Sequence, residues 1–160
     1  MRFGSADGLL ALALVVVAAL PLGCGDDDEP TPVFPEDYAA TYVEVRDCRP
    51  STEHDFANVR VLADPLAAGP YRDRDAPFPE GAVVLKEEYD LGDVSCEGDV
   101  VRWTVMQRLA AGTSADTLDW YWQAVGPRRN VQSEDESRCI GCHTTCGEPP
   151  DGYEGTCEVP

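Results

Sequence analysis

The stretch Ala82-Val83-Val84-Leu85-Lys86-Glu87-Glu88-Tyr89 predicts a β-strand in the middle of the chain. Successive side chains of a strand point to opposite faces of the sheet. Val84, Lys86 and Glu88 are therefore expected on one face, and Val83, Leu85 and Tyr89 mostly on the other. The segments on either side of this strand decide what kind of sheet it joins.

Four other segments have the apolar alternation or the β-branched and aromatic composition of strands. They are residues 42–48, 58–62, 100–109 and 118–125. In the last of them, Trp120 and Trp122 are expected on one face and Tyr121 on the other. No helical segment of comparable length is predicted, so the fold class is mainly β: a single antiparallel β-sheet domain with two or three short helices.

Two short helices are predicted from their end signals. Asp64-Pro65 is an N-cap acid followed by proline, and Gly69-Pro70 ends the helix within two turns. Residues 72–79, which are polar and rich in proline, then form a surface loop. Ser133, with Glu136 three residues on, has the pattern of a capping box and predicts a short helix that carries the residues after it.

Cys139-Ile140-Gly141-Cys142-His143 lies in that last helix and has the spacing of a c-type haem attachment motif. One helical turn puts both sulfurs on the same side, where each can bond a haem vinyl group, and the adjacent imidazole can bind the iron. The motif predicts covalent haem c held by Cys139, Cys142 and His143, with His143 as the metal ligand.

Two alternatives compete with haem attachment. Cysteines of exported proteins commonly form disulfides, so Cys139 and Cys142 could be bridged to partners elsewhere. Alternatively, C-x2-C spacing is used by zinc and iron–sulfur sites. The four thiolates of such a site would be Cys139, Cys142, Cys146 and Cys157.

The start of the chain has the pattern of an export signal. Arg2 and the apolar run from Leu9 to Leu22, too short to span a bilayer, predict a signal peptide over residues 1–23. Leu20-Pro21-Leu22-Gly23-Cys24 resembles a bacterial lipobox, in which Cys24 is acylated. The alternative is ordinary cleavage and a soluble periplasmic protein. Gly25 after the cysteine favours the outer membrane in the lipoprotein resemblance.

The mature part is predicted to consist of a tether and one domain. Residues 24–37 are acidic and rich in proline, a composition typical of an extended linker, and residues 38–160 form the folded domain. The net charge of −18 belongs to the mature part. The charge therefore disfavours nucleic acid and anionic lipid headgroups as partners, whereas it permits a cationic redox partner.

Four cysteines are left once Cys24 and the haem motif are assigned. They are Cys48, Cys96, Cys146 and Cys157, and two disulfides use them all. Three pairings are allowed. We favour Cys48 with Cys96 and Cys146 with Cys157, because the second pair closes the short tail after His143.

A sixth iron ligand has to come from upstream of the motif. Residues 144–160, which follow His143, contain neither methionine nor histidine. Met106 and His54 are the two candidates. Their alternative roles are a core methionine in an apolar strand and a solvated histidine in a polar loop.

The segment Phe78-Pro79-Glu80-Gly81-Ala82-Val83-Val84-Leu85-Lys86-Glu87, upstream of a terminal C-x-x-C-H, resembles the cytochrome P-460 family. The resemblance covers roughly residues 40–145 and implies a β-rich haem domain. Founding members oxidise hydroxylamine and carry a bond between a lysine nitrogen and a haem meso carbon. Relatives without the bond, called cytochrome c′-β, bind nitric oxide or carbon monoxide.

The resemblance also implies roles for individual residues. Lys86 lies where the cross-linking lysine of the family lies. Glu80, Glu87 and Glu88 are candidate distal bases. The chain departs from the family after the motif, since members commonly continue with an aromatic-rich segment, whereas residues 146–160 are short and expected to be closed by a disulfide.

These observations predict an exported, lipid-anchored mono-haem protein with an open distal site on the periplasmic face of the bacterial envelope, at the outer membrane. Its expected activity is redox chemistry on a small nitrogen compound such as hydroxylamine or nitric oxide, with an external electron acceptor. One alternative is a non-catalytic electron carrier or gas-binding cytochrome. The other is a haem-free, disulfide-bonded lipoprotein.

Overall fold

The computed structural model describes residue 1, residues 29–150, residues 152–157 and residue 160. Residues 2–23 of the predicted signal peptide and the predicted lipidation site Cys24 lie outside the described residues. Within the described ranges, no helix is both long enough and apolar enough to cross a membrane.

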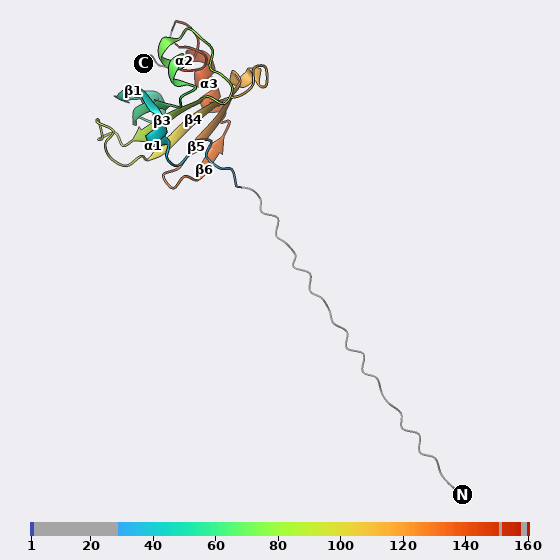
Figure 1. The fold of residues 1–160 in the computed structure, drawn as a ribbon. Helices are drawn as coiled ribbons and strands as arrows, with labels where there is room; N and C mark the ends of the chain where they lie inside the picture. Colours follow the sequence, from blue (N-terminus) through green and yellow to red (C-terminus); the bar gives the residue numbers. More distant parts are fainter. Residues whose placement is uncertain (2–28, 151, 158–159) are drawn as a thin grey trace.

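One six-stranded antiparallel sheet forms the centre of the domain (Figure 1). Neighbouring strands of the sheet are also neighbours in the sequence, in the order β1-β2-β3-β4-β5-β6. The strands are β1 (Val43–Pro50), β2 (Asn58–Ala63), β3 (Val83–Tyr89), β4 (Arg102–Arg108), β5 (Trp120–Val125) and β6 (Val131–Glu134). The prediction of a mainly β, antiparallel domain is confirmed.

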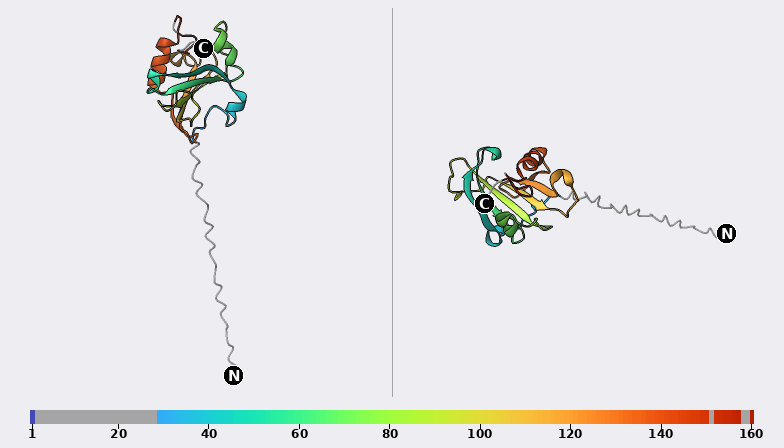
Figure 2. Two further views of the ribbon diagram at one scale, coloured as in Figure 1. Left: turned by 90° about the vertical axis from the view of Figure 1, so that its left-hand side faces the viewer. Right: turned by 90° about the horizontal axis from the view of Figure 1, so that it is seen from above.

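The helices are short and lie between or beside the strands. They are α1 (Tyr38–Thr41), α2 (Ala68–Asp73) and α3 (Ser137–Cys146), with the 3-10 turns η1 (Thr52–His54) and η2 (Ala115–Thr117). Both α2 and α3 lie at the same end of the domain as the end of the chain (Figures 1 and 2).

The prediction of α2 is wrong at both ends. The Asp64 side chain does accept the backbone N–H of Ala67 (2.8 Å), but it closes a turn, and the helix begins only at Ala68. Gly69 and Pro70 lie in the first turn, where the missing N–H of proline has no helical partner to lose. They therefore start the helix instead of ending it, and the predicted surface loop begins two residues later than expected.

The capping box predicted at Ser133 is also wrong. Ser133 lies in β6 and pairs with Ala124 of β5. The helix α3 begins three residues later than such a cap would place it, with Glu136 as N-cap and no side-chain capping bond. Pairing with the edge of a formed sheet overrides a local helix signal of this kind.

The sheet is covered on both faces, and the alternation predicted for β3 is confirmed. Val84 packs in a cluster with Met106, Trp120 and Trp122, which α2 and α3 cover. Val83 and Leu85 pack in the opposite cluster, under α1. The two tryptophans therefore share a face, as predicted.

The second cluster includes the last part of the predicted tether. Phe34 is 2% exposed, and its ring contacts Tyr38 and Trp103. Gln123 donates to the carbonyl of Thr31 (3.0 Å) and accepts the N–H of Val33 (3.0 Å). Burial of a phenylalanine contributes about 2 kcal/mol to stability, so residues 31–37 belong to the folded domain.

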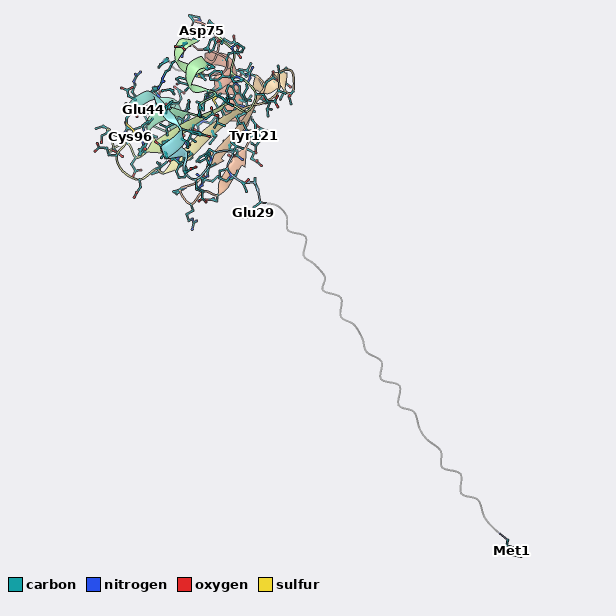
Figure 3. The ribbon with its side chains drawn as sticks, in the orientation of Figure 1. Met1, Glu29, Glu44, Asp75, Cys96 and Tyr121 are labelled. Carbon is teal, nitrogen blue, oxygen red and sulfur yellow. A yellow bond between two sulfur atoms is a disulfide. The ribbon has the colours of Figure 1, made fainter. Side chains whose placement is uncertain are left out.

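Two disulfides confirm the favoured pairing. Cys48–Cys96 ties β1 to the loop after β3, with Cα atoms 5.8 Å apart, and Cys96 lies at the margin of the domain, away from Tyr121 of β5 (Figure 3). Cys146–Cys157 ties the end of α3 to the C-terminal tail, with Cα atoms 4.9 Å apart. The second disulfide thus fixes the tail beside the predicted haem motif.

Candidate functional site

A cleft opens between the sheet and α3. It encloses about 1100 Å³ of space not filled by protein atoms, part of it open to solvent. Its wall is formed by β3, β4 and β5, its other side by α3, and its rim by η1 and the residues around it.

The cleft gathers the rarest reactive side chains of the chain. Lys86 is the single lysine of the sequence, and His54 and His143 are its two histidines. All three line the cleft, together with Cys139 and Cys142. A solvated surface would scatter these residues, so their convergence from β3, η1 and α3 marks the cleft as the functional site.

Cys139 and Cys142 are free cysteines, one turn apart on α3. Burial, with the nearby charge of Glu136, raises the pKa of the Cys139 thiol above its ordinary value. Among the described residues, the disulfide alternative for this pair is wrong, because the other cysteines form the disulfides Cys48–Cys96 and Cys146–Cys157. The metal alternative is wrong too: Cys146 and Cys157 form a disulfide, and no cluster of three or more metal-binding side chains occurs among the described residues.

His143 is held in its neutral form. It is 7% exposed, and its Nδ1 lies 2.6 Å from the carbonyl oxygen of Gly155. Because a carbonyl only accepts, Nδ1 carries the proton and Nε2 keeps its lone pair. Burial, with the charge of Lys86, lowers the pKa of His143 to about 3. This is the protonation state that an iron ligand needs.

Trp122 adds an unsatisfied donor that sequence reasoning missed. Its ring meets the His143 ring edge-on, with centroids 4.7 Å apart, and the residue is 4% exposed. Its indole N–H is buried without an acceptor among the described residues, which costs about 1–3 kcal/mol. The alternation of β5 placed Trp122 on this face but could not show that its N–H would lack a partner.

These observations fit a haem. Two unbridged thiols, a neutral imidazole and a buried N–H without an acceptor among the described residues all line one cleft. The donor set is that of a c-type haem site, in which two thioethers hold the porphyrin and histidine holds the iron.

The prediction of a solvated His54 is wrong. Its side chain is 17% exposed, with Nδ1 2.9 Å from Oε1 of Glu88 and Nε2 3.0 Å from Nζ of Lys86. Burial, with the charge of Lys86, lowers the pKa of His54 below its ordinary value. Both ring nitrogens of His54 therefore have hydrogen-bond partners.

Of the three candidate carboxylates, only Glu88 reaches this network. Glu80 is exposed in the turn before β3. Glu87 points to the opposite face of the sheet, where it accepts hydrogen bonds from Tyr38, Arg60 and Tyr89. Both are therefore excluded as distal bases by position. Met106 lines the cleft and is 4% exposed within the core cluster, so its role as a core methionine is confirmed.

Comparison with protein families matches the chain to the model described as Cytochrome P460, over residues 35–148. Comparison with curated proteins finds no match. The family match includes the whole sheet and α3, and so His54, Lys86, Cys139, Cys142 and His143. The chain therefore belongs to the cytochrome P460 family, which implies a haem cofactor.

Proposed function

We propose that this cytochrome carries covalent haem c and performs redox chemistry on a small nitrogen compound such as hydroxylamine or nitric oxide. The observation that supports it is the convergence of Cys139, Cys142, His143 and Lys86 on one cleft. A haem in this cleft supplies an iron that exchanges single electrons with a bound molecule. The electrons pass to an external acceptor. The net charge of −18 favours a cationic acceptor.

The residues of the cleft have different roles in holding the haem. Cys139 and Cys142 would hold the porphyrin through thioether bonds. His143 would bind the iron through Nε2, with its ring orientation set by the Gly155 carbonyl. On the sheet side, Lys86 places a primary amine in the cleft. In line with the family resemblance, we include in the proposal a bond from this amine to the haem edge, whose formation would break one N–H and one C–H bond and pass two electrons to a peroxide as oxidant.

The proposal also assigns a location. Residues 1–23 direct export and Cys24 carries the lipid, which anchors the domain to the periplasmic face of the outer membrane through the segment before Thr31. Labelling with a radioactive fatty acid in a bacterial host tests the anchor. A Cys24→Ser variant is its control, and a wild-type protein without label contradicts it.

Export in a host with haem-attachment machinery, followed by an optical spectrum and peptide mass spectrometry, tests the function. We expect a Soret band, haem mass on the peptide with residues 139–143, a high-spin ferric spectrum, and hydroxylamine-dependent reduction of an artificial acceptor. Cys139→Ser/Cys142→Ser is the control that loses the haem mass. Colourless mature protein excludes the haem proposal. A six-coordinate low-spin spectrum without turnover excludes the catalytic one, because Met106 or His54 then fills the distal site.

A mass spectrum of the haem peptide also tests the bond to Lys86. We expect one cross-linked species that joins haem to the peptides of residues 139–143 and Lys86. Lys86→Arg keeps the charge and cannot form it. Haem found only on the cysteine peptide contradicts the bond but leaves the redox proposal standing.

A further inference from the structure

Lys86, His54 and Glu88 form a linear hydrogen-bonded chain on the sheet side of the cleft. Lys86 Nζ lies 3.0 Å from His54 Nε2, and His54 Nδ1 lies 2.9 Å from Glu88 Oε1. Lys86 and Glu88 point to the same face of β3 because they are two residues apart. His54 reaches them from η1, the turn that joins β1 to β2.

The two neighbours of His54 require the same tautomer. A carboxylate only accepts, so His54 Nδ1 must carry the proton that it shares with Glu88. An ammonium only donates, so Nε2 must offer its lone pair to Lys86. The imidazole is thus neutral and has its basic nitrogen 3.0 Å from the lysine nitrogen.

Glu88 is held in the position that keeps the His54 ring in this orientation. It is 1% exposed, and Oε2 accepts Nε of Arg102 (2.8 Å) while Oε1 also accepts the hydroxyl of Thr104 (3.1 Å). Burial alone would raise the pKa of Glu88, but hydrogen bonds and charge from His54 and Arg102 outweigh it and hold the pKa below its ordinary value. The carboxylate therefore stays ionised and can stabilise an imidazolium.

A nucleophile within hydrogen-bond reach of a base, which a third group orients, is the general arrangement of an activated nucleophile. We propose that His54, positioned by Glu88, is the general base that takes a proton from the Lys86 nitrogen as this amine attacks an electrophile in the cleft, when the nitrogen becomes acidic. One proton moves from Lys86 Nζ to His54 Nε2, and the imidazolium keeps its Nδ1–H bond to Glu88. No electron is transferred in this step.

The proton has a route to solvent that avoids the cleft. His54 and Glu88 also line a second pocket, which the exposed side chains of Phe56, Leu91 and Val101 line as well. Water in this pocket can take the proton from His54. The charged groups around the ring come from β3, β4, α3 and its own turn: Lys86, Glu88, Arg102, Arg138, Glu53 and Asp55.

The inference rests on the proposed function in one respect. The group beside the Lys86 amine is a haem only if a haem occupies the cleft. The base chemistry itself does not depend on the haem. Glu87, the adjacent buried carboxylate, lies on the opposite face of the sheet, and its hydrogen bonds to Tyr38 and Arg60 do not involve His54. Glu87 therefore provides a matched control.

Acylation of Lys86 by N-acetoxysuccinimide, followed by peptide mass spectrometry, tests the base. Because the sequence has a single lysine, the modified peptide reports this amine alone. In the exported, haem-loaded protein at pH 7.5, we expect His54→Gln to slow acylation on the order of 100-fold, the lower range for a positioned general base. Glu88→Gln should slow it less, and Glu87→Gln should leave the rate unchanged. Where Lys86 is already bonded to haem, the same comparison is made on the full chain exported without haem-attachment machinery, in which this bond cannot form.

Rescue distinguishes a base from a structural contact. Added imidazole should restore the acylation rate of a His54→Ala variant, and Glu88→Asp should recover part of the rate lost in Glu88→Gln. His54→Asn provides a second variant if His54→Gln does not fold. Acylation at the wild-type rate in folded His54 variants, or equal slowing by Glu87→Gln, overturns the inference. A colourless protein with these rate differences overturns the haem proposal alone.

Discussion

Removing each disulfide in turn should distinguish an effect on global stability from an effect on the geometry of the site. Cys48–Cys96 closes a sequence separation of 48 residues, and Cys146–Cys157 closes one of 11. The chain-entropy relation gives about 4 kcal/mol for the longer loop and about 3 kcal/mol for the shorter one at 25 °C. Cys48→Ala/Cys96→Ala should therefore lower the free energy of unfolding more than Cys146→Ala/Cys157→Ala does.

The effect on the site should follow the opposite order. The short loop holds Gly155, whose carbonyl binds His143 Nδ1, and Glu154, whose carbonyl accepts the indole N–H of Trp120 (2.8 Å). Loss of its disulfide lets this carbonyl move, and a weaker Nδ1–H bond changes the basicity of Nε2. The longer loop ties β1 to the segment after β3 and includes neither residue.

Urea unfolding and resonance Raman spectroscopy of the iron–histidine stretch measure the two effects in the haem-loaded protein. We expect the stretching frequency to shift in Cys146→Ala/Cys157→Ala and to stay at the wild-type value in Cys48→Ala/Cys96→Ala. Equal frequencies in both variants, or a shift only in the latter, would refute the assignment of the tail as the element that orients His143.

Two further predictions concern buried titratable side chains, Glu87 and His54. Glu87→Gln should lower the unfolding free energy by about 1.5–3 kcal/mol, because Tyr38 and Arg60 lose a charged acceptor, and should leave the haem spectrum unchanged; thermal unfolding checks the first part and an optical spectrum the second. Stability should decrease as the pH falls below about 6.5, since the unfolded chain then protonates His54 while the folded chain, in which the pKa of His54 is lowered, does not. Urea unfolding between pH 4.5 and 7.5 should show a smaller slope for His54→Gln, and an identical slope would contradict the buried, neutral imidazole.

Local alternation was enough to predict the sheet and one wall of the cleft. Because side chains alternate strictly along a strand, the placement of Val84 with Lys86 and of Trp120 with Trp122 needed no tertiary information. The pairing of the disulfides followed from chain spacing and parity of the cysteines. The attachment motif on α3 was visible because its chemistry depends on neighbours in sequence.

The features that were missed depend on contacts between distant segments. His54 lies among charged residues and has the local pattern of a solvated turn, but Lys86 and Glu88 bury it from 32 and 34 residues away. Ser133 pairs with β5 instead of capping a helix, because an existing sheet edge offers it backbone partners. The bond between Gly155 and His143 likewise has no sequence signal beyond the disulfide that closes the tail.

The sequential strand order has a consequence for biogenesis. Since each strand pairs with the one just before it, the sheet can assemble as the chain emerges, with low loop-closure entropy at every step. Cys139 and Cys142 emerge after the strands that form the sheet side of the cleft. In the proposed haem protein, this side of the cleft can therefore form before the haem is attached.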